Sequence, residues 1–194
     1  MKLVIGTEST WSLRALLCAS ILDIELDIEL IDLTSCDDKA KLANVSPTKQ
    51  VPVLLVEGHV IADSLAIAEF FNDLSEGGLL PQDPYERAQA RSLVAEMHAG
   101  FTALRCELPF SVKPNTSINL SDAAKCELKR VETLFAAAHS PFMFAKPTMV
   151  DAFYAVLAYR LFSYGIQLAQ PATEYQNELV AWFEAHSVLH LVHP

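Results

Sequence analysis

Hydrophobic and polar residues at the start of the chain follow the periods of alternating strands and helices. The mostly apolar residues 2–5 predict a short strand, and the apolar positions of residues 12–22 recur at helical spacing. Residues 25–33 then alternate between apolar and mostly acidic side chains, which predicts a half-buried strand. A strand, a helix and a second strand within about thirty residues predict a βαβ unit whose strands are parallel.

The pattern continues with a hairpin and a further helix. Residues 36–48 are largely polar and predict a short helix followed by a loop. Two apolar runs, 51–56 and 59–61, flank a glycine-containing pair, which favours a tight turn between antiparallel strands. A helix is predicted at residues 64–74. The order β-α-β-(α)-β-β-α is the thioredoxin-like arrangement, and we place this domain at residues 1–78.

The second half of the chain shows only helical patterns. A linker with two prolines is predicted at residues 79–84. Three apolar stripes have helical spacing, at 93–108 (one helix, stopped by Pro109), 124–138 and 175–183. Residues 150–162 are apolar on nearly every face, which predicts a central buried helix. The predicted fold is therefore an α/β thioredoxin-like domain followed by an all-α domain over residues 85–194.

Composition and charge restrict the possible partners. The chain of 194 residues is 52% hydrophobic and 20% charged, which is typical of a globular protein. Its formal net charge of -10 repels nucleic-acid phosphates, so we expect no nucleic-acid partner. The N-terminal apolar run is too short for a signal peptide, and the apolar stretch from Ala152 is interrupted by Arg160, so we expect no membrane partner. Four cysteines without a paired spacing suggest free thiols and a cytoplasmic location.

Three histidines near the C-terminus are candidate metal ligands. His186, His190 and His193 have a helical spacing that is compatible with metal binding. Nothing in the sequence supplies them with a supporting carboxylate, and they lie at a chain end. We expect no metal site.

The first candidate for chemistry is the polar segment Ser9-Thr10-Trp11-Ser12, between the first strand and the first helix. Hydroxyls at this place can cap the helix by accepting hydrogen bonds from its backbone N–H groups. Alternatively, one hydroxyl could donate a hydrogen bond to a bound thiolate. The pKa of a thiol is about 8.5 in water, and a helix N-terminus with hydrogen-bond donors can lower it to roughly 3.5–7.5.

Two further turns lie at the same end of the predicted sheet. Val51-Pro52 can be a simple edge feature of a strand, or the cis proline that thioredoxin-like folds keep beside the active site. A cis bond there would turn the backbone of Val51 outward, to pair with an extended peptide. Asp63-Ser64 opens the predicted helix, where Ser64 is either an N-cap or a ligand of a substrate carboxylate.

Taken together, these segments resemble the cytosolic glutathione transferases over essentially the whole chain. The string from Ser9 to Arg14 resembles the serine motif of zeta-class and related bacterial members. Residues 46–54 and 63–67 resemble the peptide-binding segments of the family. Residues 148–151 resemble its helix capping box, a structural element in either interpretation.

The resemblance implies a set of glutathione-binding residues: Ser9, Thr10, Lys49, Val51, Pro52, Asp63 and Ser64. Ser9 is the implied catalytic residue, the hydrogen-bond donor to the thiolate. Val51 pairs with the cysteinyl backbone, Asp63 and Ser64 bind the γ-glutamyl end, and Lys49 binds the glycyl carboxylate. The motif leaves Thr10 and Ser12 as alternative donors.

The implied function is that of a glutathione transferase with a role in detoxification, in which glutathione attacks a small electrophilic substrate. The implied assembly is a homodimer. Two alternatives are open: a glutathione-dependent isomerase or dehalogenase, and a non-catalytic interaction protein that keeps the fold. Zeta-class members carry cysteine where this chain has Trp11, which argues against their isomerisation of a maleyl diketo acid.

Residues of the helical domain are candidates for the pocket of the second substrate: His98, Phe101, Arg105, Arg160 and Tyr164. The first three, with Thr102 as an alternative to Phe101, share a side at helical spacing. Arginines among apolar residues can bind an acidic electrophile. Equally, they can pair with Asp151 or with backbone carbonyls, because buried charges are usually paired.

Overall fold

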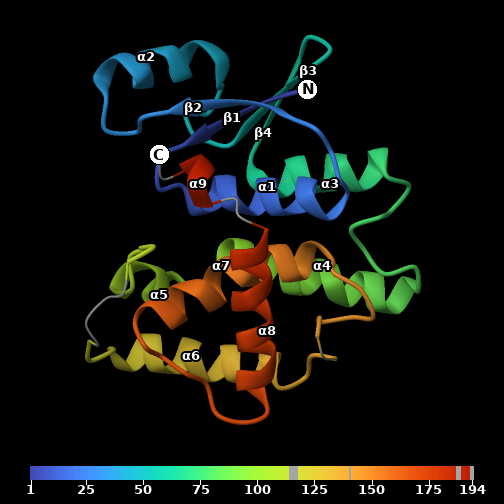
Figure 1. The fold of residues 1–194 in the computed structure, drawn as a ribbon, viewed down its shortest axis with the longest axis vertical. Helices are drawn as coiled ribbons and strands as arrows, with labels where there is room; N and C mark the ends of the chain where they lie inside the picture. The colour runs from blue at the N-terminus through green and yellow to red at the C-terminus, as the bar shows by residue number, and fades with distance from the viewer. Residues whose placement is uncertain (114–117, 140, 187–188, 193–194) are drawn as a thin grey trace. The chain divides into compact units, whose positions relative to one another are not determined.

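The computed structural model describes residues 1–113, 118–139, 141–186 and 189–192 (Figure 1). The chain forms two compact units. The first comprises residues 1–79 together with the C-terminal segment, and the second comprises residues 80–186.

A four-stranded mixed sheet forms the centre of the first unit (Figure 1). Its strands are β1 (Lys2–Gly6), β2 (Asp27–Ile31), β3 (Val53–Val56) and β4 (His59–Ala62). They lie in the order β2-β1-β3-β4. Strand β1 pairs in parallel with β2 and antiparallel with β3, and β3 and β4 form a hairpin. The parallel βαβ unit and the hairpin predicted from the sequence are both confirmed.

The helices of the first unit are α1 (Thr10–Ile21), α2 (Cys36–Val45), α3 (Ser64–Leu74) and α9 (Leu189–Val192). Helices α1 and α3 lie side by side on one face of the sheet, and α2 lies on the other (Figure 1). Helix α9 packs on α1, so these residues belong to the first unit and not to the predicted C-terminal domain. Four residues are too few to show a hydrophobic period, and only the contact with α1 decides their place.

The core of the first unit explains why the centre of β1 is an uninterrupted apolar run. Side chains alternate between the two faces of a strand. Val4 packs with Val53 and with Leu42 of α2, and all three are buried. Its neighbours Leu3 and Ile5 therefore point to the opposite face, and both are fully buried as well. Because β1 is covered on both faces, its consecutive central positions Leu3, Val4 and Ile5 are all apolar.

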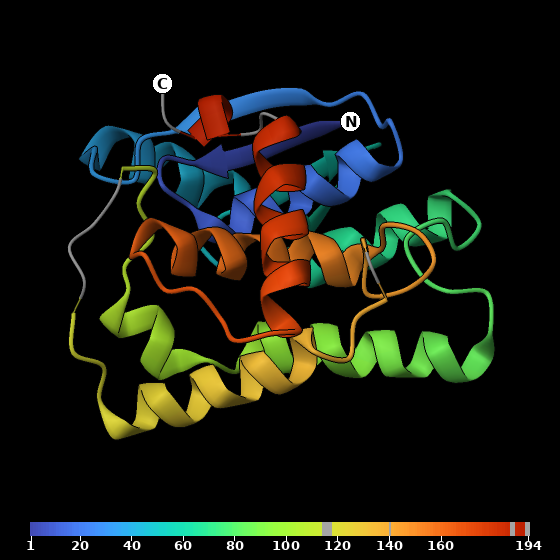
Figure 2. The same cartoon turned by 60° about the horizontal axis from the view of Figure 1, so that its bottom comes forward.

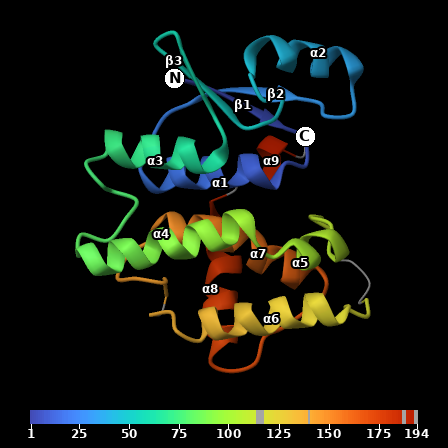
Figure 3. The same ribbon diagram turned by 180° about the vertical axis from the view of Figure 1, so that it is seen from behind.

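The second unit is built from the helices α4 (Pro84–Ala99), α5 (Thr102–Glu107), α6 (Asp122–Phe135), α7 (Met149–Ser163) and α8 (Ala172–Ala185). Helix α7 packs against both α4 and α8. Figure 2 shows α8 crossing α7, and Figure 3 shows α4 from the other side. The predicted helical architecture of this region is confirmed. Within the described ranges of the chain, no helix has the length and apolar character needed to cross a bilayer.

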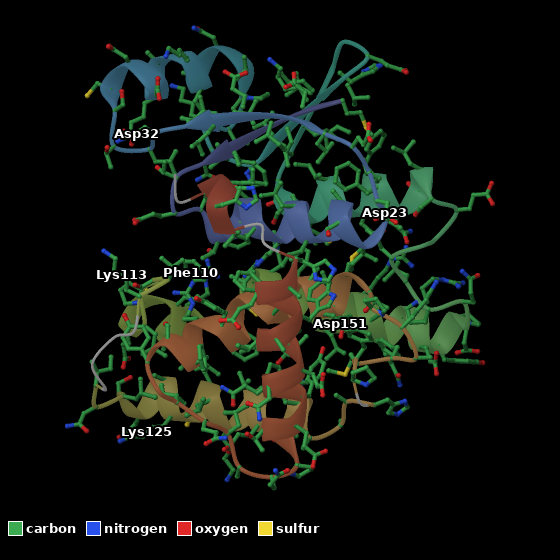
Figure 4. The ribbon with its side chains drawn as sticks, viewed as in Figure 1. Asp23, Asp32, Phe110, Lys113, Lys125 and Asp151 are labelled. Carbon is green, nitrogen blue, oxygen red and sulfur yellow. The ribbon has the colours of Figure 1, made fainter. Side chains whose placement is uncertain are left out.

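Helix α7 is the predicted central helix, and nearly all of its residues are buried. Its N-terminus carries the predicted capping box, in which Thr148 accepts a hydrogen bond from the Val150 N–H while Asp151 accepts one from the Thr148 N–H. The Asp151 carboxylate (labelled in Figure 4) also accepts hydrogen bonds from the Met143 N–H and the Tyr175 hydroxyl. Burial raises the pKa of Asp151 above its ordinary value, and these hydrogen bonds oppose the rise.

One predicted helix is two helices in the structure. The apolar stripe at 93–108 breaks at Gly100 and Phe101, between α4 and α5. Phe101 has a φ of 55° and buries its ring against Tyr154, with the ring centroids 6.2 Å apart. Helix α5 can start afresh because the Glu127 carboxylate of α6 accepts hydrogen bonds from two backbone N–H groups of its first turn. Apolar spacing cannot reveal a cap that a different helix supplies.

The predicted linker at 79–84 is shorter in the structure, and its first two residues are buried. Leu79 and Leu80 are fully buried, and the Leu79 N–H donates a hydrogen bond to the Asn72 side chain. Pro84 is the first residue of α4, and Asp83 is its N-cap. Proline is favoured at this first helical position because it has no N–H that would need a partner.

Candidate active site

A cavity of about 640 Å³ opens in the first unit, where the loop after β1, helix α2, the segment before β3 and the start of α3 meet. It is lined by every residue that the sequence assigned to glutathione: Ser9, Thr10, Lys49, Val51, Pro52, Asp63 and Ser64. Cavities of roughly 300–1,000 Å³ are usual for small ligands. Residues from distant parts of the chain therefore meet around a space of ligand size.

Ser9 is held at the N-terminus of α1. Its hydroxyl oxygen accepts a hydrogen bond from the Ser12 N–H over 3.2 Å, which makes Ser9 the N-cap. No group of the described residues accepts the proton of its hydroxyl, and the side chain lines the cavity. The first turn of α1 holds no acidic side chain that would offset the positive end of the helix. The site can therefore offer a hydroxyl donor and a helix N-terminus to an anion.

The loop that carries Ser9 is fixed by neighbouring backbone. The Thr7 N–H donates to the Ile31 carbonyl at 3.0 Å, and the Glu8 N–H donates to the Val192 carbonyl at 3.1 Å. Strand β2 and helix α9 thus hold the two residues before Ser9. The C-terminal segment is a support that the sequence did not reveal.

The other two hydroxyls of the motif have different places. Thr10 is half-buried and lines the cavity. Ser12 is fully buried, and its hydroxyl oxygen accepts a hydrogen bond from the Gly6 N–H at 3.2 Å. Ser12 is not among the cavity residues. Ser9 and Thr10 are therefore the hydroxyls of this motif that a ligand can reach.

The segment before β3 presents backbone groups to the cavity. The Val51–Pro52 peptide bond is cis, as predicted. Ahead of it, the buried Ser46 hydroxyl donates to the Gln50 carbonyl at 2.9 Å and accepts from the Gln50 N–H at 3.2 Å. Across the described residues, neither the N–H nor the carbonyl of Val51 forms a hydrogen bond. These two groups are suited to pair with an extended peptide.

The start of α3 shows which residue caps this helix and which is left for a ligand. Asp63 is the N-cap, since its carboxylate accepts a hydrogen bond from the Leu65 N–H at 2.7 Å. The alternative in which Ser64 caps this helix is therefore wrong. The Ser64 side chain is 1% exposed, and its hydroxyl has no hydrogen-bond partner in the described part of the chain. A buried hydroxyl without a partner is costly, so a ligand group is a physical reason for its presence.

Three charged residues at the cavity have positive φ angles: Glu8 (56°), Lys49 (56°) and Asp63 (81°). Such backbone is strained for residues other than glycine, and it concentrates at functional sites. Other residues with positive φ angles lie outside the cavity: Asp23, Glu57, Glu76 and Phe101. This backbone geometry therefore shapes the cavity loops without by itself marking a ligand site.

Sequence reasoning missed several cavity residues: Glu8, Trp11, Leu33, Lys39, Thr48 and Gln50. Lys39 is an exposed residue of the polar helix α2, and polarity does not say which face meets a cavity. Trp11 lies inside the recognised motif, so its adjacency to Ser9 was the signal available. With Lys39 and Lys49 the cavity carries two cations, and with Glu8 and Asp63 two anions. This mixture suits an elongated ligand with charges of both signs.

The residues proposed for the second substrate lie in the second unit, and none of them lines this cavity. Arg160 donates hydrogen bonds to the carbonyls of Leu108 and Arg105, and the Tyr164 hydroxyl donates to the Pro109 carbonyl at 3.1 Å. Burial, followed by the nearby charge of Arg105, lowers the pKa of Arg160 to about 10. Of the alternatives left open, these contacts favour pairing of Arg160 with backbone carbonyls, and not with Asp151.

The expected common face of His98, Phe101 and Arg105 is not present, because the helix break falls between them. Phe101 is 5% exposed, and the Arg105 guanidinium donates to the Gly100 carbonyl at 3.4 Å. Among the residues that the structure describes, no group of three or more histidine, cysteine or acidic side chains could hold a metal ion. His193, one of the three histidines considered above, lies outside the described residues.

Comparison with known proteins supports the resemblance to glutathione transferases for the N-terminal part of the chain. Residues 8–74 match the family model of the glutathione S-transferase N-terminal domain. A probable maleylacetoacetate isomerase of Caenorhabditis elegans is 33% identical over 98 residues, which cover 50% of this chain and 46% of that protein. Glutathione transferase GST 23 of Zea mays is 41% identical over 69 residues, covering 34% of this chain and 31% of that protein. The chain thus spans about half the length of these relatives or less.

The fold extends further than the sequence similarity. The crystal structure of a glutathione transferase homologue from Burkholderia, with bound glutathione, superposes with a TM-score of 0.72 at 21% identity. The superposition covers 96% of this chain and 97% of the Burkholderia chain, so both units share the fold of that protein.

Proposed function

Because residues 8–74 match the glutathione S-transferase N-terminal domain, we propose that this chain is a member of that superfamily, and that it binds glutathione in the cavity of the first unit and activates it as a thiolate. The sulfur then forms a bond to the electrophilic carbon of a small substrate, and the leaving group departs from that carbon with its electron pair. The thiol proton passes to solvent when glutathione binds.

The buried hydroxyl of Ser64 is the observation that carries this proposal. It has no hydrogen-bond partner among the described residues, and Ser64 is one of the residues that line the cavity, at the N-terminus of α3. A carboxylate there would accept its hydrogen bond and lie at the positive end of the helix. We assign this position to the γ-glutamyl carboxylate, with Asp63 close to the ammonium group of the same end.

The rest of the tripeptide follows from this anchor. The cysteinyl backbone pairs with the N–H and carbonyl of Val51, beside Pro52. The glycyl carboxylate extends toward Lys49 and Lys39, which supply the cations of the cavity. This orientation brings the sulfur to the N-terminus of α1, beside Ser9 and Thr10.

Ser9 lowers the pKa of the bound thiol by donating a hydrogen bond from its hydroxyl to the sulfur. The positive end of α1 contributes in the same direction. Since the thiolate is the nucleophile, a lower pKa raises its population at neutral pH. Holding sulfur and electrophile together contributes the remainder of the rate.

A second candidate function is a glutathione-dependent isomerase, which the probable maleylacetoacetate isomerase among the relatives supports. In that reaction the thiolate adds to a conjugated double bond, the resulting single bond rotates, and the thiolate leaves unchanged. The two reactions share the cavity and the role of Ser9. They differ in whether glutathione is consumed.

The binding test is calorimetric titration of glutathione into the protein and into Ser64→Ala. Loss of a hydrogen bond to a charged group, about 1.5–3 kcal/mol, should weaken binding by roughly ten- to a hundredfold. Stability should not fall, because this hydroxyl has no partner in the described structure. Ser92→Ala, on an exposed part of α4, is the control that should bind as the parent does.

Other outcomes of the binding experiments distinguish the alternative functions. A folded protein that does not bind glutathione would support the non-catalytic interaction protein. Equal binding by Ser64→Ala would overturn the orientation of the tripeptide. A screen of electrophiles and conjugated acids, with glutathione quantified before and after, separates transferase from isomerase, because only the transferase consumes it.

We further propose a homodimer in the cytoplasm, as the superfamily resemblance implies. Exposed free thiols at Cys36, Cys106 and Cys126 suit a reducing compartment. Sedimentation equilibrium would test the assembly.

A further inference from the structure

Trp11 lines the same cavity as Ser9, two residues further along α1. The proposed contacts of glutathione use hydroxyls, backbone groups and charges, and they leave this large apolar side chain without a function. The indole is half-buried, so part of its surface faces the cavity. A tryptophan beside the reacting sulfur is placed to contact whatever the sulfur attacks.

The indole is held in place from its own helix. The guanidinium carbon of Arg14 lies 4.3 Å from the centroid of the Trp11 ring. Arg14 is itself buried, with 2% of its surface exposed. A cation over an aromatic face is attracted by the π electrons, and more strongly where water is excluded. The ring therefore presents a fixed surface, which costs little entropy when a ligand packs on it.

We propose that Trp11 determines the electrophile class, by packing against planar aromatic or conjugated groups in preference to saturated alkyl groups. This inference rests on the proposed function, since the sulfur at Ser9 is what brings the electrophile to the indole. Flat π systems gain from offset stacking on tryptophan beyond the area that they bury. Saturated groups gain only the burial.

The test compares the binding of three ligands that share the tripeptide: glutathione, S-ethylglutathione and S-(2,4-dinitrophenyl)glutathione. Calorimetric titration of the parent protein should show the dinitrophenyl conjugate binding more tightly than the ethyl conjugate, by up to roughly tenfold beyond what its larger buried area supplies. In Trp11→Leu the preference should fall by up to that roughly tenfold stacking contribution, while Trp11→Phe should keep most of it. Affinity for glutathione itself should change little in both variants.

A second readout follows the indole directly. The chain has two tryptophans, so Trp182→Phe leaves Trp11 as the single reporter. Trp182 lies on α8 of the second unit, where it contacts Phe142 and His186, and it is not a cavity residue. The dinitrophenyl conjugate should quench the fluorescence of this variant far more than the ethyl conjugate does at equal saturation.

The outcomes separate this inference from the proposed function. If glutathione binds but Trp11→Leu keeps the full preference for the dinitrophenyl conjugate, the role of Trp11 is overturned and the proposed function stands. If Trp11→Leu weakens all three ligands equally, Trp11 belongs to the tripeptide site and the inference also fails. If none of the three ligands binds the folded parent protein, the proposed function fails, and the inference fails with it.

Discussion

The amide N–H of Ser12 donates a hydrogen bond to the hydroxyl oxygen of Ser9 over 3.2 Å, at the first turn of α1. This bond fixes the Ser9 oxygen and leaves its proton for another acceptor. Ser12 cannot take the same role, because its own oxygen is buried against the Gly6 N–H. The relationship orients one hydroxyl toward the cavity and retains the other as structure.

Replacing Ser9 by alanine should separate thiolate activation from helix capping. Loss of the cap should lower the free energy of unfolding by about 1 kcal/mol. The pKa of bound glutathione should rise toward about 8.5, its value in water, so that turnover falls at neutral pH and recovers in alkali. Ultraviolet absorbance of the thiolate in the saturated complex measures this pKa.

Ser35→Ala is the matched control, because Ser35 caps α2 through the Asp38 N–H and does not line the cavity. It should lose similar stability and leave the thiol pKa unchanged. An unchanged pKa in Ser9→Ala would transfer the donor role to Thr10.

Gly6→Ala should displace two side chains that line the cavity. A Cβ at this position would lie 2.7 Å from methyl groups of Leu33 and Val51, both of which line the cavity. Overpacking of this kind costs about 1–3 kcal/mol, and displacement of Val51 should weaken glutathione binding as well. Denaturant unfolding and calorimetric titration measure the two effects.

Gly78→Ala is the matched control. Its new Cβ meets Leu22 at the same distance, away from the cavity, so stability alone should fall. Unaltered glutathione affinity in Gly6→Ala would show that the position of Val51 does not matter.

The four cysteines should differ in reactivity. Cys18 is fully buried in α1, and burial raises the pKa of its thiol, so it stays protonated and inaccessible. Cys36, Cys106 and Cys126 are exposed. Titration with an aromatic disulfide reagent should therefore modify three thiols in the native protein and four after denaturation. Rapid modification of a fourth thiol in the native state would contradict the packing of α1.

The carboxyl group of Asp151 should make stability depend on pH in the acid range. Burial raises its pKa in the folded protein above 3.8, the ordinary value. At pH values between 3.8 and the raised pKa of the folded state, Asp151 is protonated in the folded protein and ionised in the unfolded chain. Lowering the pH through this window therefore stabilises the fold, and raising the pH removes that contribution.

The measurement is urea unfolding of the parent protein and of Asp151→Asn over the acid range. The stability difference, parent minus variant, should grow as the pH falls toward 3.8. A difference that grows with rising pH would mean that the hydrogen bonds from Met143, Thr148 and Tyr175 outweigh the burial of the charge.

By itself, the sequence determined most of the elements and the segments of the candidate site. Periodicity suffices for this, because an alternating strand or an apolar stripe is a local property, and the motifs at Ser9, Val51 and Asp63 are local as well. The capping box of α7 could be read in the same way, since Thr148 and Asp151 are three residues apart.

Only the tertiary structure decided which groups reach the cavity and which are already occupied. It showed that Asp63 caps α3 and leaves the Ser64 hydroxyl for a ligand, and that Arg160 is bound to backbone carbonyls. It also placed Lys39 of α2 at the cavity, and a carboxylate from α6 at the start of α5. The physical reason is that hydrogen-bond partners and exposure depend on segments far apart in the chain, and no local pattern records them.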